Sequence, residues 1–281
     1  MLSYRHAFHA GNFADVLKHV VLLEILNYLG QKEKPFCVID THAGAGKYAL
    51  DGDFALKTHE FETGISQLWQ RDDLPSSVAN YVNLQQRFNA NGQFKTYAGS
   101  PLLIKQLLRP KDKLHLFELH SNEFEILKTN MKLDKRIHIE KMDGLKHGLG
   151  LLPPVERRGL VLIDPSYEMK SDYVDVVKTL IQMHKRFATG TYALWYPVIE
   201  RGRNEALETA LKKSGIPNIA LFELGINSDN SGRGMNASGM IIINPPWNLA
   251  ATMKTVLPWL AKILGENEAG SFRIETLVAE K

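Results

Sequence analysis

The chain has 281 residues, of which 44% are hydrophobic and 23% are charged. This composition is typical of a globular protein and excludes a disordered, collagen-like or disulfide-scaffold chain. Lys and Arg number 34 against 31 Asp and Glu, so the net charge of +3 permits an anionic partner without requiring one. The single cysteine, Cys37, lies in an apolar run and cannot form an internal disulfide, so we expect a cytoplasmic location. No apolar stretch approaches the roughly 18 residues that span a bilayer, so we expect no membrane association.

Hydrophobic periodicity predicts helices that alternate with short buried strands. In chain order, the predicted helices cover 13–29, 101–108, 122–132, 173–187 and 205–214. The predicted strands are apolar throughout and are bounded by Gly, Pro or Asp; they cover 36–39, 114–117, 160–163, 192–195, 220–224 and 240–243. Strands of this kind are buried on both faces, and their alternation with helices predicts a mainly parallel sheet with helices on both sides.

One connection is longer than this alternation requires. Seventy-eight positions separate Asp40 from Glu118, whereas a strand, helix and strand need about 30 residues. We therefore predict that residues 51–97 form a small inserted helical subdomain. Residues 1–50 and 98–281 then form the main domain, with 1–12 as a tail on the substrate side.

Acidic side chains follow four consecutive strands of the predicted sheet, namely Asp40, Glu118, Asp143 and Asp164. Ligands bind at the carboxyl ends of such strands. For each acid alone, the alternative is a cap on the following helix, but their common position favours a ligand site.

The turn DTHAGAG at 40–46 narrows the class of ligand. A P-loop is excluded, because Thr41 and Tyr48 stand where a Gly and a Ser or Thr are required. A dinucleotide fingerprint fits Gly44 and Gly46, but the Asp40 carboxylate would face the pyrophosphate. S-adenosylmethionine (SAM) carries a sulfonium and an ammonium and no phosphate, so it suits the carboxylate better. The pattern resembles class I SAM-dependent methyltransferases, which have an α/β, Rossmann-like fold with a mostly parallel seven-stranded sheet.

The fourth acid opens the sequence Asp164-Pro165-Ser166-Tyr167, which resembles the Asp/Asn-Pro-Pro-aromatic signature of methyltransferases that act on exocyclic amino groups of bases. Such a nitrogen is a poor nucleophile because its lone pair is delocalised into the ring. The Asp164 carboxylate and the Pro165 carbonyl can accept its two hydrogens, and the proline ring fixes the aim of that carbonyl. We expect Tyr167 to stack on the base, and Ser166 in place of the second proline to be tolerated.

A rival match, Asn244-Pro245-Pro246-Trp247, follows the last predicted strand rather than the fourth. We interpret it as a structural turn because of this position.

Four histidines, His6, His9, His19 and His42, lie in the first 42 residues and raise the hypothesis of a metal site. No compact His spacing supports it, so we predict no metal. Tyr4, Arg5 and His6 interleave aromatic and basic side chains, which suit base stacking and phosphate binding.

Several longer strings resemble one family, the bacterial large-subunit ribosomal RNA methyltransferase J family (RlmJ). They are SYRHAFHAGN at 3–12, DVLKH at 15–19, DTHAGAG at 40–46, GSPL at 99–102, LIDPSYEMK at 162–170, RFATGTYALWYP at 186–197 and ASGMI at 237–241. The resemblance implies a SAM-dependent methyltransferase acting on N6 of one adenine in 23S ribosomal RNA, before ribosome assembly is complete. It implies SAM contacts from His19, His42, Gly44, Ser100, Glu118, Asp143, Gly144 and Asp164. It further implies a catalytic set of Asp164, Pro165 and Tyr167 with Tyr4, His6 and Lys18 on the substrate side.

Two other functions stay open at this point. One is an RNA-binding protein that keeps the fold without catalysis, and the other is a dinucleotide-dependent oxidoreductase. We expect a monomer, because no heptad pattern or apolar patch suggests a partner chain. We also expect a basic rim around the site, formed by Arg5, Lys18, Arg201, Arg203 and Arg233. The Ser100-Pro101 pair is expected to start a helix with Ser100 as its N-cap.

Overall fold

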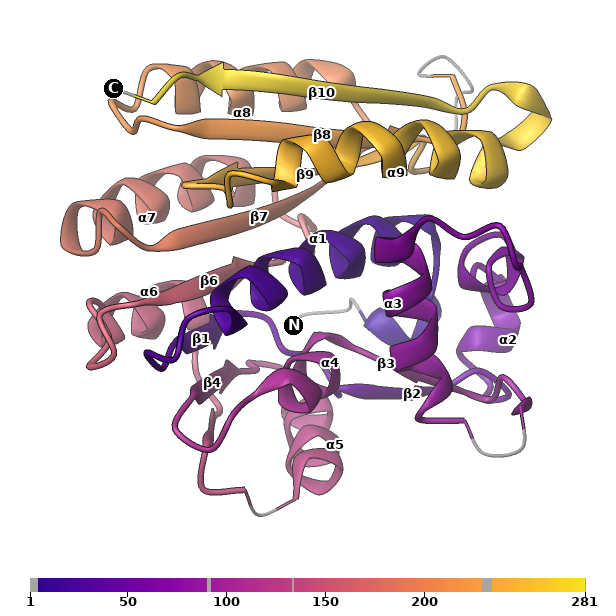
Figure 1. The fold of residues 1–281 in the computed structure, drawn as a ribbon, viewed down its shortest axis with the longest axis horizontal. Helices are drawn as coiled ribbons and strands as arrows, with labels where there is room; N and C mark the ends of the chain where they lie inside the picture. Colours follow the sequence, from indigo (N-terminus) through magenta and orange to yellow (C-terminus); the bar gives the residue numbers. More distant parts are fainter. Residues whose placement is uncertain (1–4, 90–91, 133, 229–233, 281) are drawn as a thin grey trace.

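The computed structural model describes residues 5–89, 92–132, 134–228 and 234–280. Within them, one eight-stranded sheet has the strand order β10-β8-β9-β7-β6-β1-β4-β5 (Figure 1). Its strands are β1 (Cys37–Asp40), β4 (Lys113–Phe117), β5 (Ile137–Glu140), β6 (Gly159–Ile163), β7 (Thr191–Val198), β8 (Ile219–Gly225), β9 (Ala237–Ile243) and β10 (Ser271–Val278).

Five neighbouring strands, from β5 to β7 in the sheet, pair in parallel. β9 inserts antiparallel between β7 and β8, and β10 adds an antiparallel edge beside β8. The sheet is therefore mostly parallel, which confirms the predicted fold class. The expected count of seven strands is one short. β5 and β10 have mostly half-buried or exposed side chains, so both lack the apolar run by which the other six strands were recognised.

Helices cover both faces of the sheet and enclose two apolar cores (Figure 1). One face carries α1 (Phe13–Gly30), α4 (Ser100–Leu107), α5 (Ser121–Met131) and α9 (Leu249–Leu264). The other carries α6 (Gly144–Gly148), α7 (Asp172–Arg186) and α8 (Arg201–Lys212). α1 contacts α3, α4, α9 and the sheet, so it is buried nearly all round. Short 3-10 helices, η1 (His6–Phe8), η4 (Leu149–Leu151) and η5 (Glu266–Glu268), complete these layers.

The long connection after β1 packs beside α1. It holds α2 (Ala55–Thr58), η2 (Ile65–Gln67) and α3 (Ser76–Gln86), and its last strand, β3 (Thr96–Ala98), pairs antiparallel with β2 (Lys47–Ala49). Val78 and Tyr81 of α3 belong to the same core as α1. The segment thus has the predicted helical content, while its division from the main domain at residues 51 and 97 stays a prediction.

The direction of β9 settles the place of the rival motif. Because β9 is antiparallel, its last residue, Ile243, pairs with Tyr192 near the start of β7. Asn244 therefore lies at the amino edge of the parallel strands, opposite the expected site. Its side-chain amide donates to the backbone oxygens of Ala188 and Gly190, each at 2.8 Å. The interpretation as a structural turn is confirmed.

No helix in the described ranges is both long enough and apolar enough to cross a bilayer.

Gly159, at the start of β6, is required by close strand packing. A Cβ atom there would lie 2.1 Å from the backbone oxygen of Cys37 in β1. We expect Gly159→Ala to lower the free energy of unfolding by about 1 to 3 kcal/mol, as overpacking does. Gly150→Ala is the matched control, because a Cβ atom there meets nothing within 4 Å. Urea unfolding of the two variants and the wild type measures the difference, and equal losses would contradict this account of β6.

Candidate active site

A cleft of about 740 Å³ opens at the carboxyl edge of the parallel strands. Residues implied by the family resemblance gather on its walls; they are His6, Lys18, His19, His42, Gly44, Ser100, Glu118, Asp143, Gly144, Asp164 and Pro165. They come from η1, α1, the start of α4 and the segments that follow β1, β4, β5 and β6. Tyr4 lies outside the described residues, and Tyr167 does not line the cleft.

The glycine turn after β1 brings two strand ends together. Gly44 has a φ of +60°, and a Cβ atom on it would lie 2.3 Å from the Tyr48 hydroxyl, so only glycine fits. The Gly44 amide donates to Glu118 Oε2 at 2.8 Å, and the His120 amide donates to Glu118 Oε1 at 2.6 Å. Burial raises the pKa of Glu118, although these two hydrogen bonds oppose the rise. Glu118 is thus fixed at the cleft wall and keeps lone pairs for a ligand.

Asp40 lies fully buried behind the cleft wall rather than in it. Its Oδ2 accepts from the Ser100 hydroxyl at 2.7 Å, and its Oδ1 accepts from the His42 amide at 3.2 Å. Burial raises the pKa of Asp40 to about 6 against the effect of the Ser100 hydrogen bond. Asp40 therefore positions Ser100 and His42 and does not itself meet a ligand, in contrast to the role suggested by the sequence.

The expected cap at α4 needs a small correction. Gly99, not Ser100, is the N-cap, and the Ser100 hydroxyl is used by Asp40. Ser100 is nevertheless the first residue of the helix and lines the cleft. Amides in a first helical turn have no partner within the helix, so an anionic group can bind there.

Asp143 is both a helix cap and a residue of the cleft wall. It caps α6 by accepting from the amides of Leu145 and Lys146, at 3.1 and 3.3 Å, and it also lines the cleft. Burial alone would raise its pKa, but the Lys146 side chain and these amides together lower it. Gly144 beside it is required, because a Cβ atom would lie 2.2 Å from the Thr41 backbone oxygen.

Lys18 lies between two carboxylates. Its Nζ is 2.7 Å from Asp15 Oδ1 and 2.6 Å from Asp164 Oδ2. The other Asp15 oxygen is 2.9 Å from His6 Nε2. A continuous series of side-chain contacts therefore runs from the N-terminal segment to the loop after β6. Burial alone would lower the pKa of Lys18, but the two carboxylates raise it. Lys18 is 5% exposed, so its expected place on a basic rim is wrong.

The neighbours of Asp15 favour its charged form. Burial alone would raise its pKa, but His6 and Lys18 hold it well below its ordinary value. The Gly11 amide also donates to Asp15, and the Asp15 amide donates to the Asn12 side chain at the start of α1. Asp15 was not among the site residues predicted from the sequence. Its place three residues before Lys18 was the available sign of an ion pair.

His19 presents a buried nitrogen without a partner. Its Nδ1 is 2.7 Å from the Tyr97 hydroxyl, which is 3.1 Å from the Tyr81 hydroxyl. Burial lowers the pKa of His19 to about 3, so the ring is neutral. Its Nε2 is buried and makes no hydrogen bond within the described ranges, while the residue lines the cleft. An unpaired buried polar atom is costly, and a polar group of a ligand would satisfy it.

The other early histidines also have protein partners. His9 is 2.8 Å from Glu60, and His42 Nδ1 is 2.8 Å from the Thr41 hydroxyl. Burial lowers the pKa of His42 to about 4. In the part of the chain that the structure describes, no three His, Cys, Asp or Glu side chains gather as metal ligands would.

Tyr167 departs from its expected position. Its φ is +54°, its side chain is 8% exposed, and its hydroxyl donates to the Trp195 backbone oxygen at 2.8 Å. The ring packs 4.4 Å from that of Tyr173. Tyr167 therefore belongs to the core in this structure, whereas Pro165 and Ser166 line the cleft. Stacking on a base would require this loop to change conformation.

The expected basic rim is mostly neutralised. Arg201 pairs with buried Glu223 at 2.9 Å, and Arg203 pairs with Glu200 at 2.7 Å. The Arg5 guanidinium lies 5.1 Å from the centre of the Phe54 ring. Arg233 lies outside the described residues.

The model of the family described as "Ribosomal RNA large subunit methyltransferase D, RlmJ" matches residues 33–278. The chain belongs to this family. It is 49% identical over 280 residues to the ribosomal RNA large subunit methyltransferase J of Escherichia coli (strain K12), and each chain is covered completely. It is 47% identical over 281 residues, again with complete coverage, to the protein of the same name from Haemophilus influenzae.

Solved structures agree on the fold. A crystal structure of a Legionella pneumophila protein is 36% identical and has a TM-score of 0.89, covering 95% of this chain and 98% of that one. A probable spermidine synthase from Corynebacterium glutamicum, 10% identical, has a TM-score of 0.50 and covers 96% of this chain and 77% of that one. The fold is that of class I SAM-dependent methyltransferases.

The raised pKa of Asp40 predicts a pH dependence of stability. Its folded-state pKa of about 6 lies above the ~3.9 of an unfolded aspartate, so the folded protein binds more protons between these values. Its contribution to stability is therefore full below about pH 4 and is lost as the pH rises through about 6, a change of about 2 to 3 kcal/mol. Asp40→Asn should lack this loss.

The measurement is urea unfolding of the wild type and Asp40→Asn from pH 4 to 7.5. As the pH rises, the free energy of unfolding of the wild type should fall relative to that of Asp40→Asn. Exposed Asp53 provides the control, because Asp53→Asn should follow the wild-type curve. If the difference in free energy of unfolding between the wild type and Asp40→Asn does not change with pH, the raised pKa assigned to Asp40 is contradicted.

Proposed function

We propose that this protein is a SAM-dependent methyltransferase that methylates the N6 amino group of a single adenine in 23S ribosomal RNA. One observation carries the proposal: Asp164, held by Lys18, and Pro165 line the same cleft as Glu118 and Asp143. Family membership supports it, since the relatives in Escherichia coli and Haemophilus influenzae are named as large-subunit ribosomal RNA methyltransferases.

The cleft residues fit SAM. Glu118, with lone pairs free beyond its two amide contacts, would take the ribose hydroxyls, and Asp143 with Gly144 would lie beside the adenine. The Ser100 amide and the unpaired Nε2 of His19 would contact the amino-acid end. His42, Gly44 and Asp164 complete the proposed set. Bound SAM supplies an electrophilic methyl group on a sulfonium.

Asp164 and Pro165 prepare the target nitrogen. Lys18 holds Asp164 Oδ2, and Asp164 Oδ1 makes no hydrogen bond to any side chain or backbone group in the described ranges, so it can accept one N6 hydrogen. The Pro165 carbonyl accepts the other, which favours a tetrahedral nitrogen with its lone pair toward the methyl group. The N–C bond forms as the C–S bond breaks. The excess N6 proton then leaves to Asp164 or to water.

The N-terminal segment belongs to the substrate side of this proposal. His6 lines the cleft and is anchored to Asp15, which supports a tail that lies over the flipped adenine. Tyr4 precedes this anchor by two residues, and we assign it to base or RNA contact by family resemblance. We propose that Tyr167 stacks on the base only when the loop after β6 changes conformation. We further propose that the enzyme acts as a monomer, in the cytoplasm, on naked or partly assembled RNA.

The direct test is mass spectrometry of ribosomal RNA from a strain that lacks this protein. One N6-methyladenine in 23S RNA should be missing and should return when purified protein and SAM are added. An unchanged RNA would refute the proposed function.

Asp164→Asn removes the charged acceptor and presents an amide that cannot replace it. Lys18 keeps its contact with Asp15, so the fold should survive. We expect the rate of methylation to fall at least about 100-fold, as for loss of other preorganised polar groups, with SAM affinity changed far less. Asp72→Asn, at an exposed position, should retain the wild-type rate. Substantial methylation by Asp164→Asn would overturn its catalytic role.

A further inference from the structure

The amino edge of the sheet, opposite the cleft, is strongly basic. Four connections, 31–36, 108–113, 132–136 and 152–158, lead into the neighbouring strands β1, β4, β5 and β6. Together they hold ten Lys and Arg residues and four Asp and Glu residues. Their excess of six positive charges is larger than the +3 of the whole chain, so the rest of the chain is net negative.

Arginine side chains fix these connections against one another. The Arg109 side chain pairs with Asp112 and donates to the backbone oxygens of Gly30 and Lys34. Arg136 pairs with Asp134 and donates to the backbone oxygen of Leu108. Arg158 donates to the backbone oxygen of Lys34. These contacts neutralise two of the four acids and join the connections into one surface.

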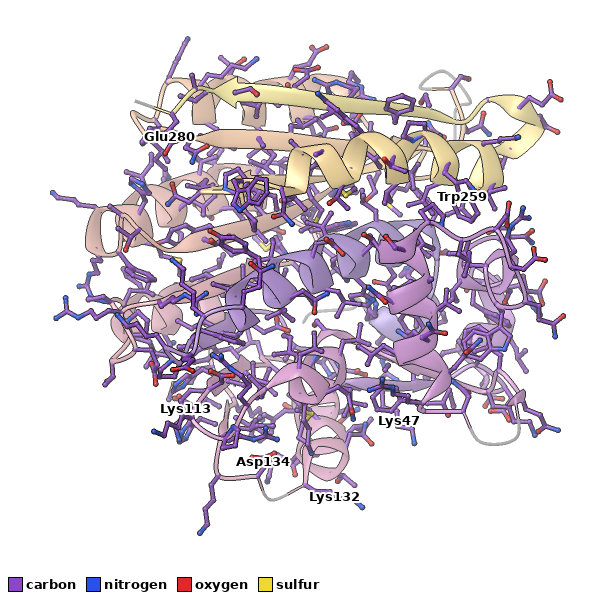
Figure 2. The ribbon with its side chains drawn as sticks, in the orientation of Figure 1. Lys47, Lys113, Lys132, Asp134, Trp259 and Glu280 are labelled. Atoms are coloured by element: carbon purple, nitrogen blue, oxygen red, sulfur yellow. The ribbon has the colours of Figure 1, made fainter. Side chains whose placement is uncertain are left out.

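The lysines of this surface point to solvent. They are exposed and form no ion pair within the described ranges; they are Lys32, Lys34, Lys111, Lys132 and Lys135. Figure 2 shows Lys113 and Lys132 at the lower end of the molecule, far from β10. Adjacent strands are about 4.8 Å apart, and these lysines lie on the connections into β1, β4 and β5, so they extend over about 10 Å. A row of unpaired cations of this length matches a run of backbone phosphates.

An edge strand joins this surface to the cleft. β5 forms the outer edge of the sheet. His138 on it and Lys141 just after it are exposed, and the next residues, Met142 and Asp143, line the cleft. Strands of four or five residues, at about 3.3 Å per residue, separate the two ends by only about 15 Å.

We propose that the amino-edge surface, formed by these four connections, binds the phosphate backbone of the substrate RNA while the target adenine occupies the cleft. This inference rests on the proposed function and adds a second RNA contact away from the reacting atoms. Lysine contacts to phosphate position an RNA without reading its sequence. They also make binding depend on salt, because each contact releases counterions from the RNA.

The test compares two variants of equal charge loss. Lys111→Gln/Lys135→Gln removes two exposed cations from the amino-edge surface, and Lys254→Gln/Lys262→Gln removes two exposed cations from α9. Binding to an unmodified 23S RNA transcript is measured from 50 to 300 mM KCl, and methylation of the same transcript is measured at varied RNA concentration.

The Lys111/Lys135 variant should bind about tenfold more weakly, and its slope of log K against log salt should be about two smaller. Its KM for RNA should rise while kcat and SAM affinity stay unchanged, because neither lysine lines the cleft. The α9 variant should match the wild type. If the wild type methylates the transcript and both variants share its KM and salt slope, this inference fails while the proposed function stands. If the wild type neither binds nor methylates the transcript, the proposed function fails first.

Discussion

Lys18 carries its charge in a place that water hardly reaches. Neighbouring carboxylates stabilise a buried ammonium, and the ammonium in turn stabilises the charge of the buried Asp15 carboxylate. Asp15 and Asp164 are each within 3 Å of the Lys18 ammonium. This contact ties α1 to the loop after β6, and through His6 it ties the N-terminal segment to the same point. The Asp164 carboxylate, the cleft wall beside it and the N-terminal segment are therefore placed by one set of contacts.

The carboxyl edge of the sheet could be predicted because it follows from strand order alone. Parallel strands end at one edge, so Glu118, Asp143 and Asp164 had to approach one another whatever the loops do. The antiparallel direction of β9 also follows from no local pattern, yet it removes Asn244 from this edge. Position in the chain was enough to identify Asn244 as structural, although the reason became visible only in the sheet pairing.

What the sequence could not predict depends on contacts between distant residues. Lys18 and Asp164 are 146 positions apart, and Lys18 was expected on a basic rim because this partner was unknown. Tyr167 belongs to a motif that predicts stacking on a base. Its positive φ and its hydrogen bond to the Trp195 backbone oxygen, however, are set by packing against β7. Arg201 was expected to meet RNA, whereas buried Glu223 needs it as a counterion. Each error comes from a partner that lies far away in the chain.

The uneven distribution of charge gives the net value of +3 a physical meaning. Acids occupy the carboxyl edge, where a cationic cofactor and an amine are expected, and unpaired lysines occupy the amino edge. The proposed methyl transfer depends most on the ion pair between Lys18 and Asp164.

The role of this ion pair is tested most directly by the single-turnover rate of methylation, at saturating SAM and RNA, for Lys18→Gln and Lys18→Arg. We expect Lys18→Gln to lose at least about 100-fold in rate, and Lys18→Arg, which keeps the cation, to lose less. SAM binding by both variants reports that the cleft is intact. A wild-type rate for Lys18→Gln would show that Asp164 does not depend on this ion pair and would contradict the account.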